Sequence, residues 1–469
     1  MNRVLLPAGL LLLVFVFLGN GLKSVVASTV FVSEADFASF LNISVEKTQL
    51  IVELLIGSAV MALAIAPFIL NTRTSRRIAV MAAVAAAAAY ACLGAVMLGQ
   101  PSLALRELVV AAAFTVGGFS VSFFSPIAQI AINGVDNERR RVLLTTLWTS
   151  AQPIAFLFTP QLVKYVAPEI GLANYFLVFA MFPLAYLVLA VTVLKPPAAA
   201  AVRQDSTGAR LSPPAVGLLL ACILSFEVWT ASNTLAGLTS AVSMALMLAF
   251  FGIVAWSALY LRRRPATGPL LPRHAALLLA CLFILEIPTT GFYDTTFLVR
   301  HLCSSTLIDD RASLGAFAQI ATVFLAGAAY VRWPRALPYL IGAGLVATLL
   351  GVAGYAYYPK VATDENFFYL TKIASGAGVG AVTTVVVAIV MASGRNNPLV
   401  ALLPALVMMF GTEFGLEILE IVFQLAKLAG RDEAGAYGAV FAAQIVAAVL
   451  AFVPFVAAIG ARTPVPAQA

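Results

Sequence analysis

The sequence predicts an all-α membrane protein that crosses the bilayer fourteen times, as two six-helix bundles with two extra helices between them. The 469 residues are 62% hydrophobic and only 10% charged. Their mean hydropathy is +0.98, which no water-soluble domain approaches. The apolar residues also form long uninterrupted runs, which are typical of membrane-spanning helices and exclude the alternating pattern of a β-barrel.

Fourteen apolar segments are each long enough to cross the bilayer, which takes about 20 residues of helix. They are 4–26, 48–70, 78–99, 107–132, 142–166, 171–194, 214–235, 238–261, 275–298, 312–331, 336–358, 366–393, 398–425 and 434–460. The first segment also resembles a signal peptide, but the topology is more consistent if it is retained as a span. Only the small-residue stretch 232–240 separates the seventh segment from the eighth, so one long helix is the alternative there.

The loop charges orient these spans. If the N-terminus is cytoplasmic, the inner loops hold 18 of the 28 basic residues. These are Arg3, Arg73, Arg76, Arg77, Arg139, Arg140, Arg141, Lys195, Arg203, Arg210, Arg262, Arg263, Arg264, Arg273, Arg332, Arg335, Arg395 and Arg462. The outer loops instead collect acidic residues, so the positive-inside rule predicts that both termini are cytoplasmic.

The spacing of the spans predicts three regions. Residues 1–194 form an N-terminal six-helix bundle, and 195–274 form a linker with two inserted transmembrane helices. Residues 275–469 form a C-terminal six-helix bundle and a short cytoplasmic tail. Paired bundles are common in secondary transporters, which bind their substrate near the middle of the membrane.

An acidic stripe marks the thirteenth span. Glu413, Glu417 and Glu420 recur at intervals of four and three residues, and Gln424 and Lys427 continue the series. At about 100° per residue, all five fall on one face of a helix. An ionised carboxylate at the bilayer centre costs roughly 2.5 kcal/mol or more, so this face must turn towards other helices or a wet cavity.

Three more ionisable residues lie inside spans of the second bundle. Glu286 and Asp294 belong to the ninth span and flank Pro288 and Gly291, which favour a kink, while Lys372 belongs to the twelfth. The set then contains five acids and one base. We expect Lys372 to pair with one acid, and one or more of the other carboxyls to hold and release a proton. The alternative is a structural role, in which these groups form acid–base pairs that hold neighbouring helices together.

Three segments carry motifs. The loop after the second span reads Pro67-Phe-Ile-Leu-Asn71-Thr-Arg73-Thr-Ser-Arg76-Arg77, the loop after the fourth reads Asp136-Asn-Glu138-Arg139-Arg140-Arg141, and the fifth span contains Ser150-Ala-Gln152-Pro153. They resemble degenerate forms of motifs of the major facilitator superfamily. Asn71 stands where that family has Asp, and Gln152-Pro153 is similar to its antiporter motif.

The resemblance is to the fourteen-span branch of drug:proton antiporters, and it implies roles for several residues. Those implied to form a gating loop are Asn71, Arg73, Arg76, Arg77, Arg139 and Arg140. In the resembled fold, the ninth, twelfth and thirteenth spans line the central cavity. Members of the branch often carry an acid in span one and an Arg in span four. Here span one has only Lys23, and span four has an apolar residue at that position.

The sequence therefore predicts a proton-coupled antiporter that exports a small molecule, cationic or amphipathic, by alternating access. The alternative is a proton-coupled importer of a nutrient or metal chelate, which the absent Arg and acid leave open. No phosphate loop is expected, because Gly376, Gly378 and Gly380 lie within an apolar helix and are better explained by close helix packing.

Further expectations concern chemistry and partners. The four cysteines and two histidines have no metal or catalytic spacing, so we expect no metal, no cofactor and no enzyme activity. The net charge of +7 is explained by inner loops rather than nucleic acid. The expected partners are substrate, protons and lipid, in a bacterial inner membrane. A periplasmic adaptor protein often assists such exporters, and the sequence does not reveal one.

Overall fold

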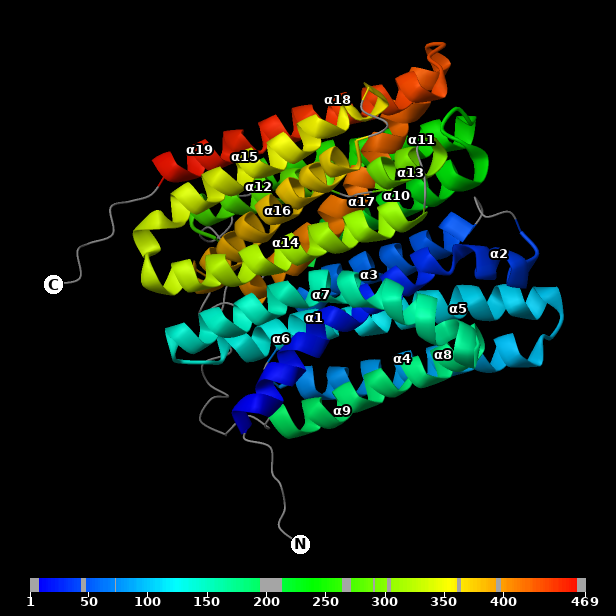
Figure 1. Ribbon diagram of the computed structural model, residues 1–469. Coiled ribbons are helices and arrows are strands. Elements are labelled where there is room, and N and C mark those ends of the chain that lie inside the picture. Colours follow the sequence, from blue (N-terminus) through cyan, green and yellow to red (C-terminus); the bar gives the residue numbers. More distant parts are fainter. Residues whose placement is uncertain are drawn as a thin grey trace, which may run out of the picture. The chain divides into compact units, whose positions relative to one another are not determined.

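The computed structural model describes residues 8–43, 48–71, 73–194, 213–263, 271–289, 292–301, 305–360, 364–393 and 398–461. Within these ranges the regular structure is helical throughout (Figure 1). The first elements are α1 (Ala8–Val32), α2 (Glu34–Leu41), α3 (Gln49–Ile69), α4 (Ser75–Gly99), α5 (Leu103–Ser122), α6 (Phe124–Asn133), α7 (Glu138–Ile170), α8 (Leu172–Phe179) and α9 (Met181–Val193). They are followed by α10 (Pro213–Ala236), α11 (Ala241–Arg263), α12 (Arg273–Thr289), α13 (Phe292–His301), α14 (Ser305–Arg332), η3 (Pro334–Ala336), α15 (Leu337–Tyr355), η4 (Tyr358–Lys360), α16 (Glu365–Ser393), α17 (Pro398–Leu428), α18 (Glu433–Leu450) and α19 (Phe452–Gly460).

The predicted all-α membrane architecture is confirmed. Among the described residues, twelve helical segments are long and apolar enough to cross a membrane. The other two predicted spans correspond to α3 and α17. In α3 the described apolar part covers only 53–69, which is shorter than the twelve segments. α17 has 31 residues and is about 46 Å long at 1.5 Å per residue, which exceeds the ~30 Å hydrocarbon core. Each predicted span therefore corresponds to one helix or to two consecutive helices.

Proline explains three of the breaks within spans. In each case the first helix ends four residues before a proline. Proline has no N–H group, so the carbonyl of that last residue loses its helical hydrogen bond. The pairs are Ser122 with Pro126, Phe179 with Pro183, and Leu450 with Pro454. The spans continue beyond the breaks as α6, α9 and α19.

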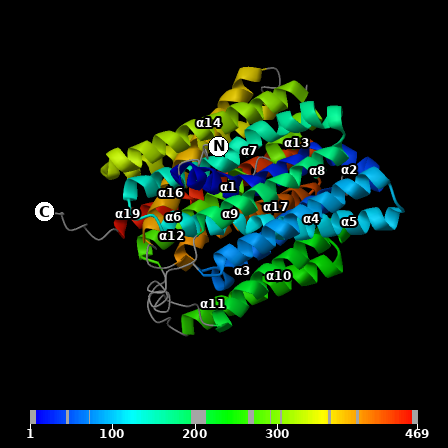
Figure 2. The ribbon, with the colours of Figure 1, turned by 90° about the horizontal axis from the view of Figure 1, so that it is seen from below.

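The seventh and eighth spans are two separate helices, as predicted. α10 ends at Ala236, and Gly237 then adopts a φ of +81°, a left-handed conformation that glycine tolerates best. α10 packs against both α11 and α3 (Figure 2). At the α3–α10 contact, the Glu227 carboxylate occupies the space left by the missing side chain of Gly57, and Thr234 donates a hydrogen bond to Glu53.

The chain forms two compact units. One comprises Met1–Asp136, Phe158–Gly268 and Asn396–Leu406, and the other comprises Asn137–Leu157, Pro269–Arg395 and Val407–Ala469. α10 and α11 thus cluster with the first unit, and the first part of α7 clusters with the second. The three regions predicted from the sequence, with boundaries at 194 and 274, stay a prediction.

Three glycines of α16 allow neighbouring helices of the second unit to approach closely. Gly376 lies against the backbone of Gly315 in α14, and Gly378 lies against Thr348 and the Gly344 carbonyl in α15. Gly380 lies against Gln319 and Thr322 of α14. α16 is therefore held between α14 and α15 (Figure 1), and the prediction that these glycines serve helix packing is confirmed.

We predict that Gly378→Val destabilises the protein by roughly 1–3 kcal/mol, because the new side chain overlaps the backbone of α15. Unfolding of the purified chain in mixed micelles measures this. Gly438→Val is the matched control, since no atom lies within 4 Å of a Cβ built at Gly438. Equal stability of the two variants would contradict the packing account.

Candidate functional site

The centre of the candidate site is Asp294 of α13, whose side chain is fully buried. Its Oδ2 atom accepts a hydrogen bond from Lys372 Nζ of α16 at 3.2 Å, and another from Arg311 Nη2 of α14. The Arg311 side chain is only 1% exposed, whereas that of Lys372 is 19% exposed. Three helices of the second unit therefore meet at one carboxylate oxygen. We call Asp294, Arg311 and Lys372 the charge triad.

Tyrosines support the guanidinium of Arg311. Arg311 Nη2 also donates to Tyr358 Oη at 2.8 Å, and the Tyr358 hydroxyl lies 2.7 Å from Thr371 Oγ1. Thr371 Oγ1 in turn donates to the Phe368 carbonyl oxygen at 2.9 Å, which leaves the Tyr358 hydroxyl to donate to Thr371 while it accepts from Arg311. The guanidinium carbon lies 5.5 Å from the ring centroid of Tyr358 and 5.6 Å from that of Tyr355, within the range of cation–π attraction.

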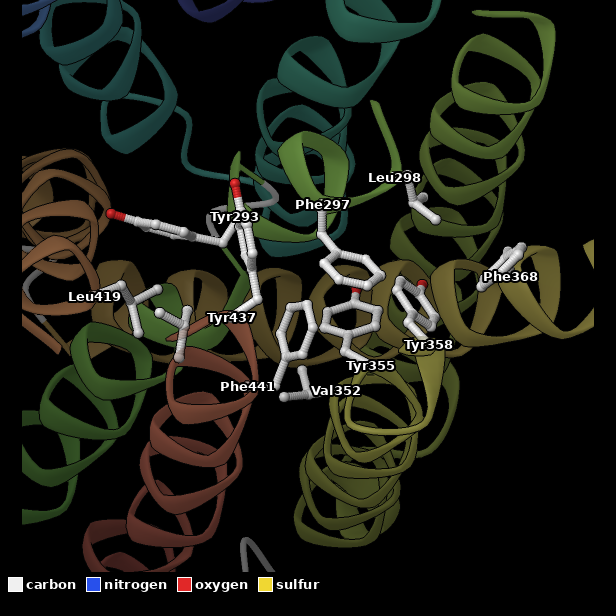
Figure 3. Packing of buried hydrophobic residues seen from close by; sticks show 11 residues of the cluster. Tyr293, Phe297, Leu298, Val352, Tyr355, Tyr358, Phe368, Leu419, Tyr437 and Phe441 are labelled. Carbon is white, nitrogen blue, oxygen red and sulfur yellow. The ribbon is translucent and has the colours of Figure 1, made fainter. Parts of the chain in front are cut away.

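An aromatic cluster surrounds these tyrosines. Figure 3 shows Tyr355 and Tyr358 side by side, with Phe297, Phe441 and Val352 packed around them. The cluster excludes water from the Arg311 side of the charge triad, while the partly exposed Lys372 forms its open side. The stem of Lys372 fits beside Gly315, where a Cβ would collide with it. A triad of two cations and one anion carries a surplus positive charge.

The acidic stripe of α17 lies beside α12 and α13. Glu413 and Glu417 are buried, at 8% and 9% exposure. Two residues before Glu413, Gly411 allows α12 to approach so closely that a Cβ there would lie 3.1 Å from Glu286 Cβ. Across this contact, Thr412 Oγ1 donates to Glu286 Oε2 at 3.2 Å.

Glu420 connects the stripe to α13. Its Oε2 atom accepts a hydrogen bond from Tyr293 Oη at 2.5 Å, and its Oε1 atom accepts one from Gln424 Nε2 at 2.6 Å. Tyr293 immediately precedes Asp294, so α13 presents one side chain to the stripe and the next to the charge triad. Lys427, the last member of the stripe, is exposed.

The structure thus places all six predicted cavity residues in the second unit, although their shared function stays a prediction. The expected pairing of Lys372 with an acid is confirmed, and its partner is Asp294. The predicted balance of five acids to one base is wrong, because Arg311 is a second buried base. In the sequence, Arg311 follows two aspartates at the edge of an apolar span and resembles a loop residue.

The predicted gating residues form two local groups. Asn71 Oδ1 accepts hydrogen bonds from the backbone N–H groups of Arg73, at 2.8 Å, and Thr74, at 2.9 Å, so its side chain closes the turn before α4. Arg73 and Arg77 are exposed and Arg76 is half-buried.

The other group begins α7. Arg139 and Arg140 are exposed in its first turn, and the next residue, Arg141, is buried. Further along α7, Gln152 is half-buried and Pro153 is buried. A gating role for either group and an antiporter role for Gln152 and Pro153 stay predictions.

Comparison with solved structures identifies the architecture. The chain is similar to the proton:xylose symporter XylE of the major facilitator superfamily, with a TM-score of 0.58, 15% identity, and coverage of 95% of this chain and 94% of that one. The human organic anion transporter MFSD10 gives a TM-score of 0.61 at 14% identity, covering 96% and 100% of the two chains. This chain has the fold of the major facilitator superfamily.

A bacterial homologue of the iron transporter ferroportin, in its outward-facing state, shows the same fold. Its TM-score is 0.60 at 14% identity, with 97% of this chain and 100% of that chain covered. At such identities the likeness extends to the fold alone. No protein-family model and no curated protein matches the sequence.

We predict that Asp294→Asn destabilises the protein by about 3–5 kcal/mol, because it leaves the buried Arg311 and the partly exposed Lys372 facing a neutral amide. Thermal unfolding of the purified chain measures the loss. Lys372→Met should cost less, since Asp294 would keep Arg311. Asp36→Asn, at an exposed carboxylate, is the control. An Asp294→Asn variant as stable as this control would show that the triad does not hold the helices together.

Proposed function

We propose that the chain is a secondary active transporter that exchanges a small molecule against protons by alternating access. The nearly full-length likeness to three transporters supports the transport part of this proposal. In alternating access, one binding site opens in turn to each side of the membrane. Such a mechanism needs no nucleotide, because the proton gradient supplies the free energy.

The observation that carries the coupling proposal is the burial of Glu413 and Glu417 on a membrane-spanning helix. A carboxylate in this setting is costly when ionised, and taking up a proton removes the charge. Neighbouring acids increase the effect, because like charges at close range disfavour each other's ionisation. We therefore assign proton uptake and release to the acidic stripe.

The hydrogen bonds of Glu286 and Glu420 support the same assignment. Thr412 donates to Glu286, and Tyr293 and Gln424 donate to Glu420. All three donors are neutral, and a protonated carboxyl retains a carbonyl oxygen that accepts such bonds. These bonds to Glu420 therefore come from uncharged groups. Asp294 differs, because two cations bond to it and its protonation would leave both of them unmatched.

Export of a cationic or amphipathic compound is the direction and substrate class that we favour. The fourteen spans predicted from the sequence and the position of Pro153 within α7 favour the drug:proton antiporter branch. The four carboxylates of α12 and α17 would attract a cation. The second candidate is a proton-coupled importer of a nutrient or metal chelate, which the charge triad favours, because its surplus positive charge would attract an anionic group.

The proposed setting is a bacterial inner membrane with both termini in the cytoplasm, and with a periplasmic adaptor as a further partner of an exporter. The proposed gating residues of the loops before α4 and α7 lie on the cytoplasmic side in this topology. Inverted membrane vesicles distinguish the two candidate functions. A proton gradient, acid inside, drives accumulation of solute by an exporter and loss of solute by an importer.

We predict that Glu417→Gln abolishes proton-coupled transport and leaves expression and folding intact, since the neutral amide mimics a carboxyl that cannot release its proton. The measurement uses proteoliposomes with an internal pH-sensitive dye and a panel of lipophilic cations. Solute-driven proton flux should fall to the level of protein-free vesicles, while exchange of labelled for unlabelled solute should persist.

Glu365→Gln is the matched control, because it makes the same chemical change at an exposed carboxylate in the first turn of α16. Its proton flux should equal that of the unaltered chain. Normal proton flux in Glu417→Gln would remove Glu417 from the coupling mechanism.

A further inference from the structure

A groove of about 470 Å³ lies between α15 and α19 in the second unit. Pro338, Tyr339, Gly342 and Ala343 line it from α15, and Phe455 and Ile459 line it from α19. Arg335, in the short helix η3 that precedes α15, completes the lining. Figure 1 shows α15 and α19 running side by side, with the last turns of α19 near the start of α15.

Helix spacing creates the groove. Arg335, Tyr339 and Gly342 follow one another at intervals of four and three residues, so they lie along one face, with Arg335 at its N-terminal end. Phe455 and Ile459 are one turn apart on α19. Gly342 has no side chain, and a Cβ there would lie 3.5 Å from the Phe455 ring. The small residues of α15 therefore form the floor between two rows of larger side chains.

The groove lies on an apolar surface of the kind that faces lipid. Both helices are parts of apolar membrane-spanning segments. Large apolar side chains on the same two helices are exposed, including Val346 at 46%, Val453 at 65% and Val456 at 61%. Tyr339 is 80% exposed, and Trp333, beside Arg335, is 60% exposed. Trp and Tyr at the end of an apolar span are typical of the boundary between hydrocarbon and head groups.

The charge at the end of the groove defines its ligand. Arg335 is exposed at the mouth, and Arg332 lies in the same turn, with its guanidinium carbon 6.0 Å from the Trp333 ring centroid. A guanidinium binds phosphate through paired hydrogen bonds, and basic residues at the ends of spans attract anionic lipids. An apolar channel that ends at an arginine matches a molecule with an acyl chain and a phosphate.

We propose that this groove is a binding site for an anionic phospholipid. Its phosphate lies at Arg335 and the Tyr339 hydroxyl, and one acyl chain follows Gly342, Ala343, Phe455 and Ile459. Gly342 is seven residues after Arg335, about 10 Å along the helix, which takes the acyl chain into the hydrocarbon region. The site is independent of the proposed transport function, because it shares no residue with the charge triad or the acidic stripe.

Native mass spectrometry of the purified full-length chain tests the proposal by titration with phosphatidylglycerol or phosphatidylcholine. The unaltered chain should bind phosphatidylglycerol more tightly. Arg335→Gln should weaken that binding about fivefold, the effect of one basic residue at a membrane surface. Arg335→Lys should retain most of it. Arg332→Gln removes a charge from the same loop but does not line the groove, and should bind like the unaltered chain.

Gly342→Leu fills the floor of the groove and should reduce binding of the acyl chain while Arg335 remains. A melting curve for each variant confirms that it is folded. Equal effects of Arg335→Gln and Arg332→Gln, or equal binding of the two lipids, would overturn the proposal. So would a Gly342→Leu variant that binds lipid normally. A change from dimer to monomer in Gly342→Leu, without a change in bound lipid, would instead identify a second copy of the chain as the occupant.

Discussion

An ionised group in the hydrocarbon region of a membrane persists only if a partner compensates the lost hydration. In the second unit Asp294 satisfies this condition with two cations, Arg311 and Lys372, that come from different helices. The three residues lie far apart in the sequence, so the ion pairs fix α13 against α14 and α16. Breaking one partner of a buried pair is costly because a charge is left without compensation. The charge triad therefore fixes the positions of α13, α14 and α16 relative to one another along their axes.

The packing around the charge triad makes this arrangement possible. Gly376 and Gly315 bring α16 and α14 into backbone contact, and this close approach lets Lys372 reach Asp294. On the other side, Tyr355 and Tyr358 cover Arg311 with rings and hydroxyls. Small residues and aromatic residues thus have complementary roles: the former determine the distance between helices, and the latter exclude water from the charges between them. The acidic stripe of α17, which bonds to α13 through Tyr293, lies outside this compensated centre.

Much of the fold was predictable from the sequence because the bilayer imposes a minimum length and polarity on every span. The approximate number of spans, the break between the seventh and eighth spans within 232–240 and the packing role of the α16 glycines follow from local composition. The proton-coupling candidates were also visible, since an acid within an apolar run is conspicuous. Arg311 was not predictable, because a cation beside two aspartates at the edge of a span is ordinary for a loop. Its burial depends on Tyr358 and Asp294, contacts between distant parts of the chain that periodicity does not record.

The central claim is that the acidic face of α17 meets a water-accessible space rather than lipid. Cysteine substitution at Glu420, compared with Val422 on the opposite face, tests it most directly, in a chain whose four native cysteines are replaced. The account predicts that a membrane-impermeant thiol reagent labels the cysteine at 420 and that labelling slows when a transported solute is added. It predicts no labelling at 422. Labelling of neither position, or of both equally, would contradict the account.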